Sequence, residues 1–340
     1  MRSKLSDRTL VVGPAWVGDM VMAQALFKAI KARFDTSIDV LAPEWSRPLT
    51  ERMPEVSSSI VMPLKHKELS LKTRYQLGKK LASNQYQRCF VLPNSFKSAL
   101  VPFWANIPER IGWRGEWRYG LINNMRILDK ARYPLMVERY MALAYGAAED
   151  LPKPLFRPSL VANKDNLVGA LQRYRLTLGA PLLVLCPGAE FGPSKRWPES
   201  YYAQLASYYL ARGWQVWIFG AAKDQEVAQA IQMLTQKRCI DLTGRTTLAD
   251  AIDLMSQANR VVSNDSGLMH IAAALDRPLV AVYGSTDPGF TPPLNECVKI
   301  VQEKIACSPC FKRICPKQHH RCMRDLSVQK VIQAVEQLVT

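Results

Sequence analysis

Short apolar runs rich in Val, Ile and Leu alternate along the chain with longer segments whose apolar residues recur at helical spacing. Near the N-terminus, the apolar run at residues 9–13 is followed by a helical pattern at 20–33 and a second run at 37–42. Uninterrupted apolar runs are typical of strands buried on both faces, as in a parallel sheet. The chain therefore begins with a βαβ unit, and the pattern predicts further strands at 59–62 and 88–92 around a helix at 71–83.

The same alternation is clearer in the second half of the chain. Five strands are predicted, at residues 182–186, 215–219, 239–242, 260–263 and 278–284. The helices between them are predicted at residues 198–212, 225–236, 248–258 and 268–275. Pro198 and Gly213 bracket the first of these helices, which is the usual placement of the two residues. Strands and helices in strict alternation predict a second doubly wound parallel sheet.

A proline-rich stretch separates the two halves. Residues 148–163 contain Pro152, Pro154 and Pro158, a composition typical of a linker. We therefore expect an α/β protein with two Rossmann-like domains, residues 1–160 and 161–326. A closing amphipathic helix at 327–340 could pack back on the first domain.

The composition and net charge of the chain restrict the classes of protein to which it can belong. The chain has 340 residues, 48% of them hydrophobic and 22% charged, as in folded globular proteins, and a formal net charge of +16. The charge predicts an anionic partner, which could be a nucleic acid, a membrane surface or a phosphorylated substrate. The sequence contains neither a secretory signal pattern nor a run of ~20 apolar residues, so we expect a cytoplasmic protein.

Polar turns follow several of the predicted strands. Residues 264–267 and 285–288 end neighbouring strands, and residues 188–197 contain Ser194 and Lys195 just before a helix. Carboxyl ends of parallel strands collect ligands, and helix N-termini favour phosphate. These turns therefore predict a phosphate-binding site, although the spacing is not that of a Walker A loop.

The first turn, after residues 9–13, does not fit a dinucleotide site. It offers only Gly13 and Gly18, and the acidic Asp19 would repel a pyrophosphate at this helix N-terminus. Asp19 has two interpretations from position alone. It could cap the helix, or it could act as a general base at the end of the first strand.

Basic residues gather in two parts of the first half. One is residues 65–80; the other is residues 110–132, where basic residues are interleaved with Trp113, Trp117 and Tyr119. Such mixing is compatible with base stacking, with a groove for a phosphorylated glycolipid, or with a solvated helix face.

The turns together resemble those of the bacterial heptosyltransferases, glycosyltransferase family 9. The resemblance rests on Val17-Gly18-Asp19, Pro187-Gly188, Lys195-Arg196-Trp197-Pro198-Glu199, Asn264-Asp265-Ser266-Gly267-x-x-His270-x-Ala272-Ala273 and Tyr283-Gly284-x-Thr286-Asp287-Pro288. It spans nearly the whole chain and implies the GT-B architecture, in which an acceptor-binding domain and an ADP-heptose-binding domain face each other across a cleft.

The resemblance also implies a reaction and its residues. Heptose would pass with inversion, without a metal or other cofactor, from ADP-heptose to the phosphorylated lipid A–Kdo–heptose acceptor at the inner membrane. The favoured addition is the second heptose, and another core heptose is the alternative. Asp19 would be the base, Lys195 would hold the diphosphate and Asp224 would meet the ribose. The remaining donor contacts would be Ser194, Asp265, Ser266, Gly267 and His270, and the acceptor-side basic groove would contain Lys65, Lys67, Arg110, Arg114 and Arg118.

The resemblance to the heptosyltransferases assigns no role to a cluster of cysteines near the C-terminus. Cys307-x2-Cys310-x4-Cys315-x6-Cys322 could ligate a structural zinc, but it lacks the second C-x2-C pair of a zinc ribbon, and reduced or disulfide-linked thiols are the alternative. The rival function is a basic nucleic-acid-binding protein that uses this cluster as a zinc site. It does not account for the polar turns at one sheet edge, so we expect no nucleic-acid partner.

Overall fold

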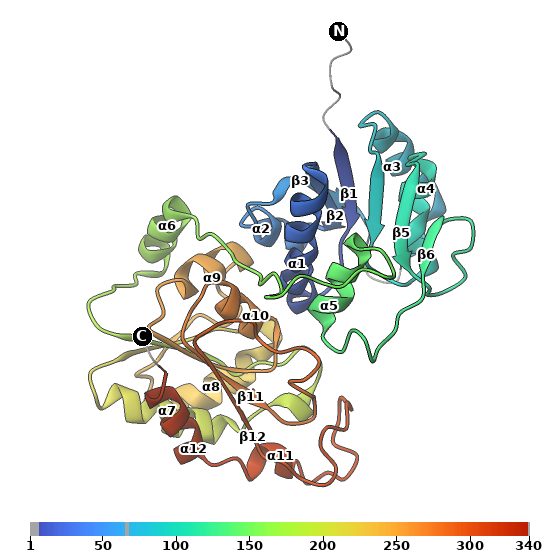
Figure 1. Ribbon diagram of the computed structural model, residues 1–340. Coiled ribbons are helices and arrows are strands. Elements are labelled where there is room, and N and C mark those ends of the chain that lie inside the picture. The colour runs from blue at the N-terminus through green and yellow to red at the C-terminus, as the bar shows by residue number, and fades with distance from the viewer. Residues whose placement is uncertain (1–6, 65–67, 339–340) are drawn as a thin grey trace. The chain divides into compact units, whose positions relative to one another are not determined.

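The chain forms two compact units that divide between Pro158 and Ser159. The computed structural model describes residues 7–64 and 68–338 (Figure 1). The division falls inside the proline-rich stretch, where the composition predicts a linker. Each unit is an α/β fold built on its own sheet, so the two are described in turn.

The first unit is organised around a six-stranded parallel sheet in the order β3-β2-β1-β4-β5-β6. Its strands are β1 Arg8–Val12, β2 Ser37–Pro43, β3 Val56–Met62, β4 Arg88–Val91, β5 Glu109–Trp113 and β6 Asn124–Arg126. Its helices are α1 Val17–Phe34, α2 Arg47–Thr50, α3 Leu71–Ala82, α4 Leu100–Trp104 and α5 Met136–Met141. Leu10 and Val11 of the central strand are fully buried, which is why this segment reads as an unbroken apolar run.

The second unit repeats the plan with the order β12-β11-β10-β7-β8-β9, again all parallel. Its strands are β7 Leu182–Cys186, β8 Gln215–Ile218, β9 Ile240–Asp241, β10 Arg260–Asn264, β11 Leu279–Tyr283 and β12 Val298–Gln302. Its helices are α6 Lys164–Tyr174, α7 Glu199–Leu210, α8 Gln225–Leu234, α9 Leu248–Met255, α10 Gly267–Ala274, α11 Arg321–Arg324 and α12 Val328–Glu336.

The closing helix belongs to the second unit. α12 packs against α7, β11 and β12, and its Val331 and Val335 are buried in the same core cluster as Trp197. These contacts bury its apolar face within the second unit.

Two edge strands, β6 and β12, were not predicted from the sequence, and neither was β5, which lies between β4 and β6 and has three buried residues. β6 and β12 contain no more than one buried residue. A strand covered on few sides need not be apolar, so it lacks the run that identifies a central strand.

The strand order reverses at the same point in the two sheets. In each, the first strand lies beside the fourth, so the strand order reverses between β1 and β4 and between β7 and β10. Open parallel sheets bind ligands at such reversal points, at the carboxyl ends of the strands. The turns after β1, β7 and β10 therefore lie where chemistry is expected.

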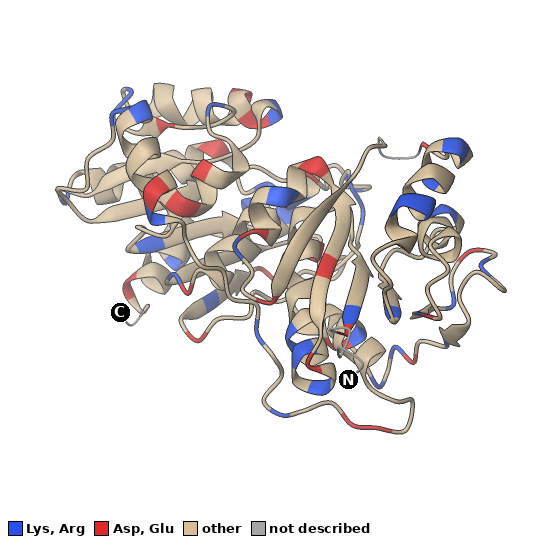
Figure 2. Cartoon of the chain, turned by 90° about the horizontal axis from the view of Figure 1, so that it is seen from above, with Lys and Arg blue, Asp and Glu red and all other residues tan. Residues whose placement is uncertain are grey.

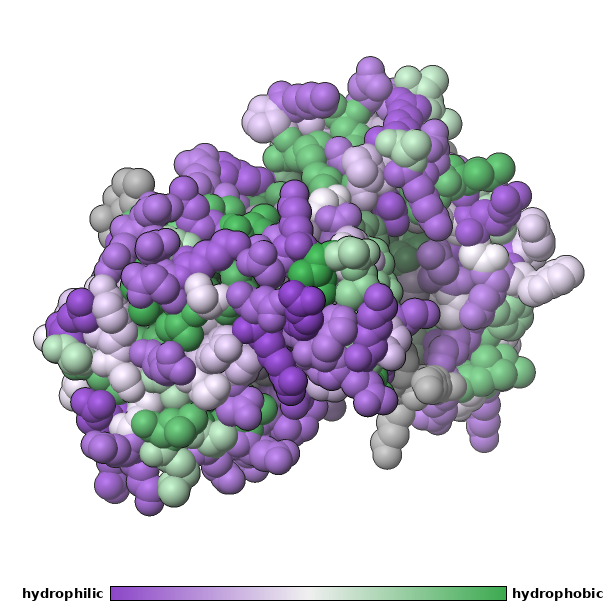
Figure 3. All heavy atoms as spheres, turned by 90° about the horizontal axis from the view of Figure 1, so that it is seen from below, coloured by the Kyte–Doolittle hydropathy of each residue, from purple (hydrophilic) through white to green (hydrophobic). Residues whose placement is uncertain are grey.

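The face of the molecule shown in Figure 3 is mainly hydrophilic, with apolar side chains distributed among polar ones. Within residues 7–64 and 68–338, no helix combines the length and the apolar character needed to cross a bilayer.

Candidate functional site

The turns after β7, β10 and β11 meet in a compact polar cluster. Lys195, at the end of the short 3-10 helix Pro193–Lys195, places its Nζ 2.5 Å from Oδ2 of Asp265. The Thr286 hydroxyl donates to the same carboxylate oxygen at 2.6 Å. The structure thus brings together Lys195 and Asp265, as the sheet topology requires. It adds Thr286, which lies in one of the motifs but was not predicted as a site residue.

This ion pair is largely removed from solvent. The side chains of Lys195 and Asp265 are 12% and 5% exposed, and the Lys195 ammonium also lies 4.9 Å from the centre of the Phe191 ring. Asp265 therefore fixes the lysine at the carboxyl edge of the sheet. An anionic ligand there would share a cation that is already oriented.

A buried asparagine connects the strand ends to the loop that carries Lys195. The Asn264 side-chain oxygen accepts hydrogen bonds from Trp197 N at 3.1 Å and from the Tyr202 hydroxyl at 3.0 Å. Its amide nitrogen donates to Pro187 O at 2.7 Å. Asn264 is fully buried and uses both ends of its amide. It therefore holds residues 187–198, the loop between β7 and α7 that we call the β7 loop, against the end of β10.

His270 lies on α10 with 6% exposure. Burial lowers its pKa to about 4, although the Asp265 carboxylate raises the pKa and Lys195 lowers it further. The imidazole is therefore neutral at pH 7 and can hydrogen-bond to a ligand without contributing a full positive charge.

Ser266 and Gly267 form the strand-to-helix turn before α10. Ser266 is the N-cap residue in an extended conformation, and its hydroxyl lies 3.3 Å from that of Ser263. Gly267 is the first helical residue, so the backbone N–H groups of this first turn lie at the carboxyl edge of the sheet.

Two other predicted donor residues have internal partners. The Ser194 hydroxyl is buried, lies 3.0 Å from that of Ser285 and donates to Lys312 O. Asp224 Oδ2 accepts from Ala221 N at 3.0 Å, and Arg196 lies 3.5 Å from its other oxygen. A Cβ at Gly188 would lie 2.4 Å from Asp224, which explains the glycine. Both side chains shape the loops in this structure, and direct ligand contact remains a prediction for them.

Asp19 is not an N-cap. α1 begins at Val17, earlier than the pattern predicted, with Trp16 at its N-cap position, so Asp19 is the third residue of its first turn. It is partly buried, and Tyr140 has a pKa raised well above its usual value by burial and by the Asp19 carboxylate. The structure therefore removes the capping interpretation and leaves a carboxylate at the strand reversal point of the first unit.

Of the basic residues of the predicted acceptor groove, Arg110, Arg114 and Arg118 lie among the residues that the structure describes. Lys65 and Lys67 lie outside the described residues. Arg114 is exposed. Arg110 directs its guanidinium to the carbonyls of Ile107, Leu121 and Gly120.

Arg118 requires a correction. It is completely buried, and its guanidinium donates to Pro93 O at 2.7 Å and to Trp113 O. Burial and these carbonyls make it an internal brace, so we remove it from the groove. The alternation of basic and aromatic residues gave no sign of which side chains point inward.

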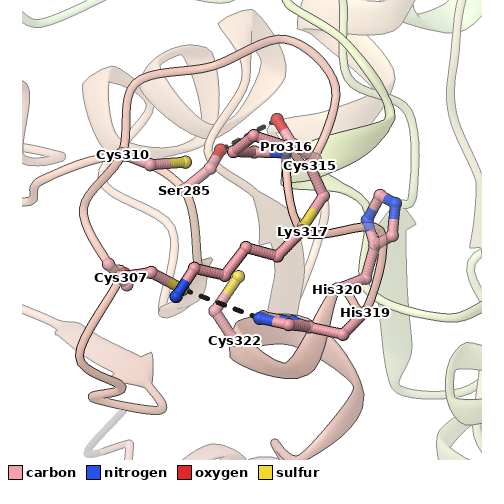
Figure 4. Close-up of a pocket in the computed structure, with 11 residues that line it drawn as sticks. Ser285, Cys307, Cys310, Cys315, Pro316, Lys317, His319, His320 and Cys322 are labelled. Carbon is pink, nitrogen blue, oxygen red and sulfur yellow. Dashed lines mark hydrogen bonds between the residues drawn. The ribbon is translucent and has the colours of Figure 1, made fainter.

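The cysteine segment, residues 307–322, packs against the β7 loop, where Ser194 donates hydrogen bonds to the carbonyls of Lys312 and Arg313. Cys307, Cys310, Cys315 and Cys322 line one pocket together with His319 and His320 (Figure 4), and all four cysteines are free thiols. In the part of the chain that the structure describes, no three His, Cys, Asp or Glu side chains are arranged to hold a metal ion.

The thiols of this segment differ in acidity. Burial raises the pKa of Cys315, but backbone N–H groups of residues 317–320 outweigh it and lower the pKa overall. Burial and the other three sulfurs raise the pKa of Cys322 to about 11.

The comparisons with known proteins agree with this architecture. Residues 74–321 match the family model described as glycosyltransferase family 9 (heptosyltransferase). Lipopolysaccharide heptosyltransferase 2 of Salmonella typhimurium strain LT2 is 47% identical over 98% of this chain and 99% of its own length, and that of Escherichia coli K12 is 46% identical over 98% of each. The solved structure of E. coli ADP-heptose lps heptosyltransferase II superposes with a TM-score of 0.87, at 44% identity over 97% of both chains. The two-domain GT-B fold expected from the motifs is thereby confirmed. The chain belongs to glycosyltransferase family 9, the heptosyltransferases.

Proposed function

We propose that this glycosyltransferase moves heptose from ADP-heptose to the first heptose of the lipopolysaccharide inner core and so adds the second heptose. The observation that carries the proposal is near full-length identity, at 46% and 47%, to enzymes named heptosyltransferase 2. The polar cluster at the carboxyl edge of the second sheet supplies a site of the kind that such a donor needs.

The donor is assigned to the second unit. Lys195 neutralises charge on the diphosphate, and the backbone N–H groups of Ser266, the N-cap residue, and Gly267, the first residue of α10, add to this neutralisation. Asp265 accepts hydrogen bonds from sugar hydroxyls, since a carboxylate facing phosphate would repel it. His270 contributes a neutral hydrogen-bonding group, and Ser194 and Asp224 complete the predicted contacts.

The chemistry is a single inverting displacement. A base takes the acceptor hydroxyl's proton as that oxygen bonds to the anomeric carbon, and the bond to the diphosphate oxygen breaks with ADP departing. Asp19, at the carboxyl edge of the first sheet, is the proposed base. The departing diphosphate needs charge neutralisation more than a proton, which is the part assigned to Lys195 and α10.

The acceptor is a phosphorylated lipid A–Kdo–heptose molecule, and the enzyme acts at the cytoplasmic face of the inner membrane as a peripheral protein. Arg114, Lys65 and Lys67 remain the proposed basic contacts for it, and Arg110 can contribute only if it leaves its carbonyl partners.

The test is transfer from ADP-heptose to lipid A precursors that carry zero, one or two heptoses. We expect the precursor with one heptose to be the preferred acceptor. Preference for the precursor without heptose would overturn the assigned step. Filter binding to RNA and DNA at two salt concentrations, run beside it, tests the rival nucleic-acid function.

A further inference from the structure

The loop between β5 and β6 exposes two large aromatic side chains. Trp117 is 84% exposed and Tyr119 is 68% exposed, and their rings meet edge to face with centroids 6.4 Å apart. Aromatic residues of this size are normally at least half buried, so a neighbouring pair this exposed marks an interaction surface.

The loop is held firmly in this conformation. Arg118, between the two aromatic residues in sequence, is completely buried and bonded to Pro93 O and Trp113 O. Glu116 N donates to Asn94 O at 3.0 Å. With residue 118 pinned inward, residues 117 and 119 point to solvent as a preformed pair, so their ordering costs little entropy on binding.

Further apolar surface lies beside the pair. Phe96 is 39% exposed, and its backbone N–H donates to the Glu116 carboxylate at 2.7 Å. Phe103 of α4 is 40% exposed and stacks under Arg110, whose guanidinium reaches Gly120 O. We call Phe96, Phe103, Trp117 and Tyr119 the aromatic patch.

The charge around the aromatic patch is positive. Arg114 is exposed in the same loop, and α3, which packs against α4, exposes Lys72, Lys79 and Lys80. Figure 2 shows where the basic positions lie along the chain. Glu116 is the acidic residue of the loop, and its carboxylate is occupied by Phe96 N. Exposed aromatic rings surrounded by cations complement a surface that is apolar just beneath an anionic layer.

We propose that the aromatic patch docks the first unit on an anionic phospholipid bilayer. Trp117 and Tyr119 lie at the boundary between headgroups and acyl chains, where their amphipathic rings are favoured, and the exposed lysines of α3 face lipid phosphates. The inference extends the proposed function, whose acceptor is a lipid, but the docking needs neither substrate.

The test is flotation of the full-length protein with vesicles that contain no lipopolysaccharide precursor. Vesicles of phosphatidylethanolamine and phosphatidylglycerol are compared with phosphatidylcholine alone. We expect wild type to bind the anionic vesicles, and Trp117→Ser/Tyr119→Ser to lower its partition coefficient about tenfold or more, since each ring buries a large apolar area. The matched control is Met233→Ser/Leu234→Ser in the second unit, which removes side chains that are 70% and 57% exposed and should leave binding unchanged.

Transfer to a deacylated, water-soluble acceptor separates docking from catalysis. The aromatic double variant should keep wild-type turnover with that acceptor and lose turnover only when the acceptor is in vesicles. Equal loss with both acceptors would assign the patch to the acceptor sugar instead and overturn the proposal. Equal vesicle binding of wild type and the double variant would also overturn the proposal. So would RNA binding by wild type and by the control variant that is lost in the aromatic double variant, because the patch would then bind nucleic acid. Failure of the proposed function would leave the vesicle result unaffected.

Discussion

At the scale of single residues, Asp19 carries the clearest prediction. Replacing it with asparagine removes the proposed base while keeping the size of the side chain. We expect kcat to fall by about 10²–10⁴-fold, because that is the usual contribution of a general base, with the Kd for ADP-heptose unchanged. Steady-state rates and a donor titration measure the two quantities.

Asp35→Asn is the matched control for this variant. Asp35 caps the other end of α1 in a left-handed conformation that asparagine tolerates. The kcat of the Asp35→Asn variant should therefore match that of wild type. Wild-type kcat in the Asp19 variant would show that another group takes the proton.

The Lys195–Asp265 pair has two roles that can be separated. Lys195→Met leaves a buried carboxylate without its cation, so we expect the free energy of unfolding to fall by roughly 3 kcal/mol and donor affinity to fall as well. Adding Asp265→Asn removes the unpaired charge and should restore stability but not affinity. Urea unfolding and donor titration of both variants test this, and a double variant that binds donor like wild type would exclude the diphosphate role.

His270 predicts a pH dependence of stability. Its folded pKa of about 4 lies below the ordinary 6.5, so the unfolded chain takes up the proton first. The stability it contributes is complete above pH 6.5 and is lost as pH falls toward 4, by about 2 kcal/mol at pH 5. Urea unfolding of wild type and His270→Gln at pH 7 and pH 5 isolates the effect, since the variant should lose less stability. Equal losses in both proteins would mean that His270 is not buried neutral.

At the scale of elements, the conformation of the β7 loop depends on its contacts with the cysteine segment. Gly192 has φ 154°, and a Cβ there would lie 2.5 Å from Arg313 O, next to the bond from Ser194 N to the same oxygen. Gly192→Ala should therefore displace Lys195, raise the KM for ADP-heptose and lower the free energy of unfolding by about 1–3 kcal/mol.

Gly179→Ala is the control for that variant, because nothing lies within 4 Å of a Cβ at Gly179. Both variants are compared by initial rates over a range of donor concentrations and by thermal unfolding. If Gly192→Ala behaved like the control, the cysteine segment would not position the loop.

The sequence predicted the central elements well because burial on both faces forces apolar runs. β1, β7, β10 and β11 all carry this signal. The edge strands β6 and β12 do not, and the short helices α2, α4 and α5 lack enough turns to show a period.

The site was predictable only in part. Strand-end turns identified where Lys195, Asp265 and Asp19 would lie, because topology fixes backbone positions. The inward course of Arg118, the neutral state of His270 and the bracing by Asn264 depend on side-chain direction and burial, which the spacing of residues along the chain does not specify.

At the scale of the whole molecule, assignment of the donor to the second unit predicts where ADP stabilises the protein. ADP at about 100 times its Kd should stabilise the folded donor site by about 2.7 kcal/mol. We expect hydrogen exchange to slow in the β7 loop and α10, and to stay unchanged in β2 and β3. Mass spectrometry of exchanged peptides measures this, and slower exchange confined to the first unit would reverse the assignment.

The repeated strand order also has a consequence for synthesis. Among residues 7–64 and 68–338, all strands of the first sheet lie between Arg8 and Arg126, so each has been made before the second sheet begins at Leu182. Translation adds about 5–20 residues per second, slowly compared with the folding of a small domain. The first unit can therefore be complete while the ribosome is still making the second, and its apolar strands need not wait exposed for the rest of the chain.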